Sequence, residues 1–131
     1  MYENEWPLGN EIFYIVVSCS CFEHDDFFWK HSYYLLARCL KPGGILFSTV
    51  PSAGLYHGYA GDNWGFFNVS SVALTKWAKK NNEDILLLHT STLPRNESNI
   101  YLAFGMTNMI FLKRSLSKVE ETNLNIEEKY W

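Results

Sequence analysis

Residues 12–50, IFYIVVSCSCFEHDDFFWKHSYYLLARCLKPGGILFSTV, decide the fold of this chain. Two short apolar runs within it, residues 12–17 and 45–50, are rich in β-branched and aromatic side chains, which is typical of strands buried on both faces. Between them, Asp25 or Asp26 can cap a helix of about residues 26–40, which the KPGG run ends. Strand, helix and strand predict a parallel βαβ unit. Because ligands bind beyond the carboxyl ends of parallel strands, we expect chemistry in the loop of residues 18–24.

Apolar periodicity predicts the remaining elements. The first helix places Trp29, Tyr33, Leu36 and Leu40 along one stripe. A second helix, from about residue 68 to 80, has Val69, Ala73 and Trp77 on one face, joined by Leu74 and Ala78. Two further strands are expected at residues 84–88 and 109–112, with most of residues 92–106 as a loop. Residues 115–131 read as a polar acidic tail, either a marginal helix or disordered.

Size and charge exclude several classes of protein. A chain of 131 residues forms at most one domain, and 47% hydrophobic residues are enough for a core. Eleven Lys and Arg face 14 Asp and Glu, and no basic stripe is present, so we expect no nucleic-acid partner. The apolar runs are too short to cross a bilayer, and the acidic N-terminus does not resemble a signal peptide. We therefore expect no membrane partner and a cytoplasmic protein.

Three cysteines are an odd number, which argues against a complete disulfide framework. Cys19, Cys21 and His24 form the spacing C-x-C-x2-H, which can indicate zinc, but no second ligand pair follows at the spacing of a structural site. Adjacent carboxylates and His24 rarely converge on one ion. The expectation is therefore reduced thiols and no metal.

The segment after the second strand, PSAGLYHGYAGDNWGFF at residues 51–67, is long for a loop in a compact domain and is rich in glycine and aromatic residues. Long loops at such positions are usually functional. The alternative is that its aromatic side chains only close the core from above.

The ordered set IVVSCSCFEH, ARCLKPGG and ILFSTVPSAG resembles the C-terminal half of class I S-adenosylmethionine-dependent methyltransferases, and H-x-Y-x-GDNW-x-F-F with ALTKWAK fits the same family. The resemblance covers residues 6–114. It implies an α/β fold, the C-terminal half of a Rossmann-like sheet, with strands equivalent to 4, 5, 7 and 6, the last strand antiparallel, and two main helices.

The first half of that family's domain has no counterpart in this sequence. The family holds the cofactor with a glycine-rich turn and an acidic residue in that half, and no G-x-G-x-x-G follows a strand here. We therefore expect residues 1–114 to be a partial, truncated methyltransferase domain and residues 115–131 a tail. The first strand would become an uncharged sheet edge, which is a template for pairing with another chain. The expected partners are a second copy of the chain, as a homodimer, or a chain that carries the missing half.

The resemblance also implies roles for single residues. Ser18, Cys19, Ser20 and Glu23 would contact S-adenosylmethionine, although small residues at a strand end are often only turn formers. His24 would accept a proton from the methyl acceptor, or, with Glu23, would only cap the helix start. His57, Asp62, Asn63 and Trp64 would form the substrate pocket or lid, for a small molecule or a glycan.

Two functions from different classes remain. One is an enzyme part, inactive alone or dependent on a partner that supplies the first half. The other is a non-catalytic interaction or structural remnant that self-associates through the exposed first strand. A free-standing small enzyme fits less well, because it would lose the glycine-turn and ribose contacts of the cofactor.

Overall fold

The computed structural model describes residues 8–54, 64–81, 83–95 and 104–114. Its strands are β1 (Phe13–Cys19), β2 (Leu40–Ala53), β3 (Ile85–Leu93) and β4 (Gly105–Lys113). Its helices are the 3-10 turn η1 (Phe22–His24), the π-helical η2 (Trp29–Tyr33), α1 (Tyr34–Cys39) and α2 (Asn68–Lys80).

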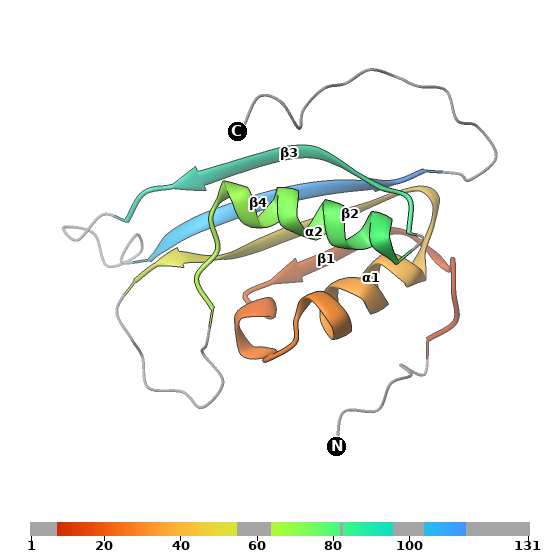
Figure 1. The fold of residues 1–131 in the computed structure, drawn as a ribbon, viewed down its shortest axis with the longest axis horizontal. Coiled ribbons are helices and arrows are strands. Elements are labelled where there is room, and N and C mark those ends of the chain that lie inside the picture. The colour runs from red at the N-terminus through yellow and green to blue at the C-terminus, as the bar shows by residue number, and fades with distance from the viewer. Residues whose placement is uncertain (1–7, 55–63, 82, 96–103, 115–131) are drawn as a thin grey trace.

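The four strands form one mixed sheet in the order β1-β2-β4-β3 (Figure 1). β1 and β2 run parallel, and β4 runs antiparallel to both of its neighbours. The helical segment between β1 and β2 confirms the predicted βαβ unit. The strand order and the antiparallel β4 confirm the fold class expected from the resemblance.

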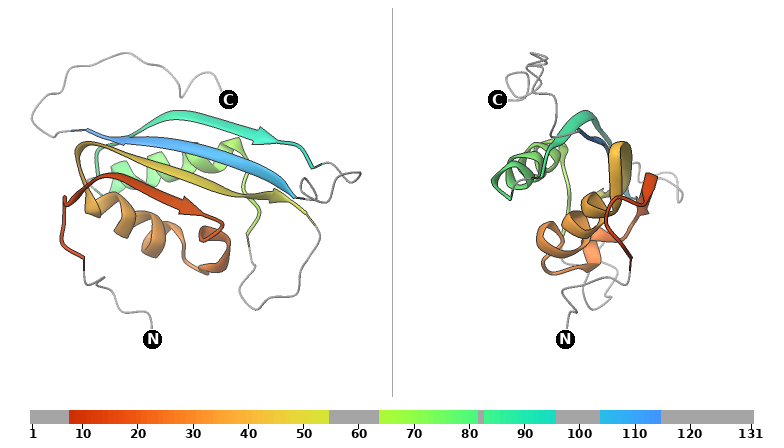
Figure 2. Two further views of the ribbon diagram at one scale, coloured as in Figure 1. Left: turned by 180° about the vertical axis from the view of Figure 1, so that it is seen from behind. Right: turned by 90° about the vertical axis from the view of Figure 1, so that its right-hand side faces the viewer.

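All described helices lie on one side of the sheet, and no described helix covers the other side (Figure 2). α1 packs against β2, and α2 packs mainly against β3. The core between the sheet and the helices contains large side chains that are fully buried: Phe22, Tyr33, Leu40, Leu46, Val50, Phe66, Ile85, Met109 and Phe111. Alternate residues of β2 and β4 point into this core, as the period of a strand requires.

The first helix is shorter and less regular than its periodicity predicts. Residues 22–39 divide into η1, η2 and α1, and Tyr33 N donates to Phe28 O, the spacing of a π turn. The predicted stripe is nevertheless correct in its core positions, because Tyr33 and Leu40 are buried and Trp29 and Leu36 are half-buried. The KPGG run does end the helix, but β2 already begins at Leu40, and its register against β1 jumps across that run.

The predicted face of α2 was correct at Leu74, Trp77 and Ala78, which are buried or packed on the core, but wrong at Val69 and Ala73. Val69 is 54% exposed and Ala73 is also exposed. Instead, Ser71, Val72, Leu74, Thr75 and Ala78 face the sheet. The two hydroxyl residues are tolerated there because each donates a hydrogen bond to the backbone of its own helix, Ser71 Oγ to Asn68 O at 2.5 Å and Thr75 Oγ1 to Ser71 O at 3.0 Å.

β3 and β4 are both longer than predicted. The last residues of β3 and the first residues of β4 lie in the stretch that was expected to be mostly loop. The tail of residues 115–131 lies outside the described residues. Within the part of the chain that the structure describes, no helix has the length and apolar character needed to span a membrane.

Lys113, the last residue of β4, contacts groups from several other parts of the chain. Its Nζ lies 3.3 Å from Ala37 O and 3.5 Å from Arg38 O, so it satisfies carbonyl groups at the C-terminus of α1. The same ammonium group lies 3.6 Å from a carboxylate oxygen of Glu11 and 4.0 Å from one of Glu83. Lys113 is buried, and these oxygen atoms compensate the cost of burying its charge.

Candidate functional site

The carboxyl ends of β1 and β2 lie side by side and define the place where the family's chemistry is expected. Ser18 is opposite Ser48 and Cys19 is opposite Thr49 in the parallel ladder. The chain stays against β2 for one residue beyond the strand, because Ser20 N donates to Thr49 O at 2.9 Å. The predicted cofactor residues therefore begin at the edge where ligands of open α/β sheets bind.

Ser18 and Ser48 place two hydroxyl groups on the inner face of the sheet. Both side chains are buried, and neither Oγ atom has a hydrogen-bond partner among the described residues. A buried hydroxyl without a partner costs about 1–3 kcal/mol. These two atoms are thus able to bond to a group that the described residues do not supply.

Cys19, Ser20 and Cys21 form a tight turn. Ser20 adopts φ +47, in the left-handed region that is uncommon for residues other than glycine. Cys21 Sγ donates to Cys19 O at 3.1 Å, and both thiols are free and exposed. Backbone strain of this kind is often found at ligand-binding positions, so it is consistent with the predicted backbone contacts to a cofactor.

Glu23 and His24 lie together in η1 but differ in exposure. Glu23 is buried, whereas His24 is exposed, and its Nε2 lies 3.8 Å from Glu23 Oε1. Of the acidic residues at the helix start, Asp25 makes the capping contact, since its Oδ1 accepts a hydrogen bond from Phe27 N at 3.0 Å. His24 is therefore exposed at the surface beside the buried carboxylate of Glu23.

No group of three His, Cys, Asp or Glu side chains comes close enough to hold a metal ion within the described ranges. The spacing of Cys19, Cys21 and His24 does not gather their side chains into such a group.

Of the predicted substrate residues, only Trp64 belongs to the described structure; His57, Asp62 and Asn63 lie outside it. Trp64 is 37% exposed and packs at right angles on Trp29, with 5.6 Å between the ring centroids. Phe28 lies 5.5 Å from Trp64 and 4.7 Å from Phe66. These four side chains, Phe28, Trp29, Trp64 and Phe66, are called the aromatic wall below.

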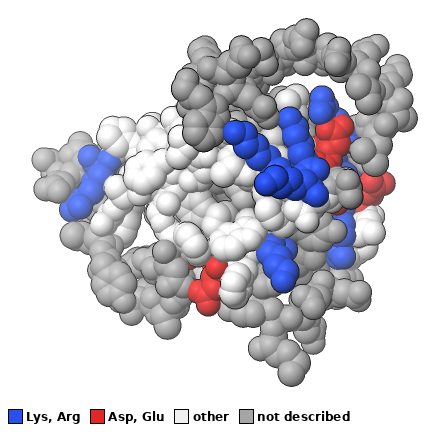
Figure 3. Space-filling view, in the orientation of Figure 1, with Lys and Arg blue, Asp and Glu red and all other residues white. Residues whose placement is uncertain are grey.

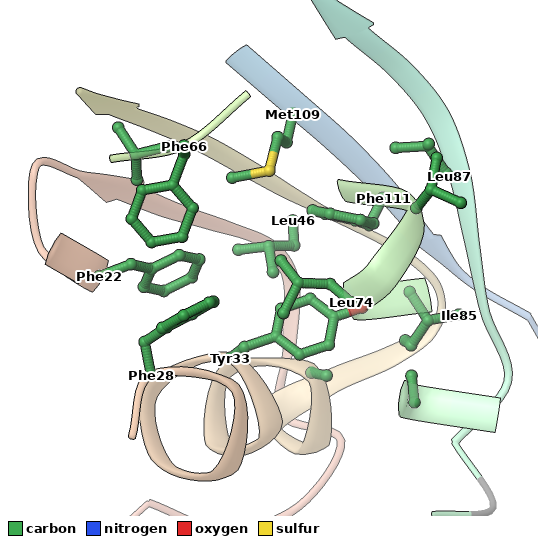
Figure 4. Close-up of a cluster of buried hydrophobic side chains, with 14 of the residues drawn as sticks. Phe22, Phe28, Tyr33, Leu46, Phe66, Leu74, Ile85, Leu87, Met109 and Phe111 are labelled. Atoms are coloured by element: carbon green, nitrogen blue, oxygen red, sulfur yellow. The ribbon is translucent and has the colours of Figure 1, made fainter. Parts of the chain in front are cut away.

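The aromatic wall joins the loop after β1 to the segment that precedes α2. Figure 4 shows Phe22, Phe28 and Phe66 close to one another at the end of the core nearest η1. The sequence analysis singled out neither Phe28 nor Phe66. The interleaved aromatic residues at 64–67 were the available signal, and the buried Phe66 with its ring contact to Phe28 fits the reading in which these side chains close the core.

A network of hydrogen bonds holds the segment that carries Trp64. Thr107 Oγ1 donates to Phe66 O at 2.7 Å and lies 2.9 Å from Thr92 Oγ1. Thr92 Oγ1 also lies 2.8 Å from Asn68 Oδ1, at the start of α2. Sequence reasoning missed this network, because Thr92 and Thr107 fall at the borders of the stretch expected to be loop.

Basic side chains gather on the helix-covered face over the C-terminal half of α2, which contains Lys76, Lys79 and Lys80, while much of that face is uncharged (Figure 3). Lysines in the last turn of a helix favour the helix dipole. This cluster therefore has a structural explanation.

The sequence matches no family model and no curated protein. Among solved structures, the chain is similar to the Burkholderia thailandensis 1,6-didemethyltoxoflavin-N1-methyltransferase with bound S-adenosylhomocysteine, with a TM-score of 0.61 and 17% identity over 82% of this chain and 46% of that one. It is also similar to the Haloferax volcanii complex between the Trm112 methyltransferase activator and its proposed methyltransferase (TM-score 0.57, 14% identity, 86% of this chain and 59% of that one). The [4+2]-cyclase SpnF matches with a TM-score of 0.57 and 11% identity, over 84% of this chain and 54% of that one.

The chain spans about half the length of these solved structures. One of the three is a cyclase, so the shared fold does not determine the reaction. The strand order, the antiparallel β4 and these matches together show that the chain has a partial methyltransferase-domain fold, the C-terminal half of a class I S-adenosylmethionine-dependent methyltransferase sheet.

Proposed function

We propose that this chain is the second half of a S-adenosylmethionine-dependent methyltransferase domain, and that it binds the cofactor and transfers methyl groups only together with a polypeptide that carries the first half. The observation that carries this proposal is the combination of the loop at the carboxyl end of β1 with an unpaired β1 edge beside it. Of the similar structures, the Burkholderia thailandensis enzyme contains S-adenosylhomocysteine and the Haloferax volcanii protein is in a complex with an activator, which supports a cofactor and a partner.

The residues present fit one part of the cofactor. Ser18 Oγ is a buried donor without a partner, and the turn at Ser20 presents backbone groups at the same sheet end. Cys19 and Glu23 complete this set, which would hold the methionine part. No glycine-rich turn and no acidic residue for the ribose are present in the sequence, so those contacts must come from the first half.

When bound, S-adenosylmethionine supplies a methyl group whose bond to the sulfonium sulfur breaks as a bond to the acceptor forms. His24 is exposed beside this place, and its Nε2 would take the proton that a hydroxyl or amine acceptor loses. Glu23 would orient the imidazole ring from its buried position, and the aromatic wall would exclude water from one side of the acceptor.

The predicted substrate residues His57, Asp62 and Asn63 would complete the acceptor pocket opposite Trp64. Aromatic and amide groups together suit a small polar ring, such as a sugar. We propose that the assembled enzyme acts in the cytoplasm.

The test is calorimetric titration of S-adenosylmethionine and S-adenosylhomocysteine into the chain alone and into a chimera. The chimera joins the first half of the Burkholderia thailandensis enzyme to the N-terminal side of Trp6. We expect no saturable binding to the chain alone, binding to the chimera, and weaker binding when Ser18→Val is added to the chimera.

Saturable binding by the chain alone would contradict the need for a partner. A chimera that melts cooperatively but binds neither ligand would contradict the cofactor site. The matched control is Ser91→Val on β3, a half-buried serine outside the loop, which should leave binding unchanged.

A specific observation also favours the non-catalytic alternative, in which the chain only self-associates. The exposed apolar side chains of β1 support this alternative, because they can pair with a second copy of the chain without any cofactor.

A further inference from the structure

Among the described residues, the three most exposed large apolar side chains lie on β1. Tyr14 is 66% exposed, Ile15 68% and Val17 58%. The residues that point outward from β2 between Ile45 and Pro51, and those that point outward from β4, are less exposed, since all of them are half-buried. β1 contains no Lys, Arg, Asp, Glu or Pro, the residues with which proteins usually protect a sheet edge.

The direction of the backbone groups on β1 follows from one hydrogen bond. Ser20 N points towards β2, because it donates to Thr49 O. Backbone groups alternate in direction along a strand, so those of Phe13, Ile15, Val17 and Cys19 point away from β2, into the open edge. The side chains of these same four residues lie on the sheet face that no described helix covers.

We infer that β1 is a dimerisation edge, on which a second copy of this chain pairs antiparallel about a twofold axis at Val16. This register uses the full strand. It places Ile15 opposite Val17 of the other copy and Phe13 opposite Cys19 of the other copy. Every open backbone group then exchanges a hydrogen bond, and no charged side chains face one another.

A second copy fits this edge better than a charged segment, because the exposed side chains of Phe13, Ile15 and Val17 are apolar and β1 has no charged side chain. A strand of seven residues is about 23 Å long, so the interface is small and its dissociation constant should be micromolar.

One consequence of this inference rests on the proposed function. The strand of the first half would occupy the same edge, so the homodimer and the cofactor-binding assembly exclude each other. The dimer itself does not need that proposal, and its test contains no cofactor, so either proposal can fail alone.

The test uses cross-linking of the full chain. In an antiparallel pair that exchanges hydrogen bonds, opposite Cα atoms lie about 5.5 Å apart, within the span of a disulfide. In a Cys21→Ser background, Phe13→Cys should therefore cross-link to Cys19 of the other copy under mild oxidation and give a covalent dimer. Without Phe13→Cys, the two Cys19 residues lie about 20 Å apart and should not react.

The matched control is Leu88→Cys in the same background, an exposed position on β3 at the other edge, which should stay monomeric. In sedimentation experiments, Ile15→Lys alone should weaken the dimer by more than about tenfold. Mixing Ile15→Lys with Val17→Glu should restore it, because the two introduced charges face each other in this register.

A chain that is monomeric from about 1 to about 100 µM and does not cross-link would overturn the inference. Equal cross-linking through Leu88→Cys would overturn it too, since association would then not be specific to β1. So would a monomer that dimerises only when residues 115–131 are removed, because the tail would then be the occupant of the edge.

Discussion

The two edges of the sheet are built differently. β3 has a register break between Leu87 and His89, a bulge of the kind that discourages edge pairing, and α2 packs on its inner side. β1 pairs regularly from Ile15 to Cys19, and its one fully buried residue is Ser18. Neither strand contains Lys, Arg, Asp, Glu or Pro, and β1 has a register break of its own between Phe13 and Ile15. The two edges therefore differ mainly in exposure, since Ile15 is 68% and Val17 58% exposed, against 41% for Leu88 and 52% for Leu93 on β3.

The resemblance to class I methyltransferases implies a longer sheet, with the strand order 3-2-1-4-5-7-6. In that order the equivalent of β3 is a true edge, and the equivalent of β1 lies between two strands. The greater exposure of β1 is what the proposed assembly predicts, because only β1 would gain a neighbouring strand in it.

The largest difference in stability should be found between two variants with the same substitution, isoleucine to alanine, one on each edge strand. Ile85→Ala on β3 removes a side chain that is 1% exposed, and we expect a loss of about 2–5 kcal/mol in the free energy of unfolding. Ile15→Ala on β1 should change it by less than about 0.5 kcal/mol. Urea unfolding at low protein concentration measures both. Equal losses would mean that β1 is as well packed as β3 and would break the comparison.

A smaller effect is expected at Lys113, which links the lead-in segments of both edges through Glu11, before β1, and Glu83, before β3. Lys113→Met removes its hydrogen bonds to the carbonyl groups at the end of α1, and we expect a loss of about 1.5–3 kcal/mol. Lys30→Met, at an exposed position, is the matched control and should be neutral. If both variants unfold at the same urea concentration, Lys113 does not stabilise these segments.

The smallest effect is expected at Tyr33, in the core between the helices and β4, where its ring lies 5.3 Å from that of Phe111. Burial raises the pKa of the Tyr33 phenol well above its ordinary value of 10.0, and the charge of Glu83 adds to the rise. The unfolded chain therefore loses this proton above about pH 10 while the folded chain keeps it. The stability that Tyr33 contributes is full below pH 10 and falls as the pH rises further.

Tyr33 Oη is buried and has no hydrogen-bond partner among the described residues. Tyr33→Phe should therefore be neutral or stabilising by up to about 1 kcal/mol at pH 7. Its advantage over the original chain should grow above pH 10. Urea unfolding at pH 7 and at pH 10.5 measures this difference, and a variant that loses stability at both values would show that the hydroxyl group is used.

The fold was largely predictable, because residues 12–17, the KPGG run and residues 45–50 are short-range signals for strand, turn and strand. The strand order came from the resemblance and not from periodicity. The orientation of α2 was not predictable from apolar spacing, because Ser71 and Thr75 satisfy their hydroxyl groups within the helix and so replace Val69 and Ala73 on the buried face.

The candidate site was predictable only near β1. Ser18 lies near the end of β1, and Ser20 and His24 follow that strand closely in sequence, so the position of these residues could be predicted, although their roles stay predictions. The aromatic wall joins Phe28 to Phe66, which are far apart in sequence, and such a contact has no local signal.

The most direct test of the claim that β1 is an open edge is hydrogen exchange at single amides of β1 and β3, measured in dilute and in concentrated protein. The amides of Phe13, Ile15 and Val17 should exchange fast in dilute protein and become protected as the concentration rises, while the amides of β3 stay unchanged. If the three β1 amides are already protected in dilute protein, or if both strands respond alike to concentration, then β1 is not an open edge and the account is wrong.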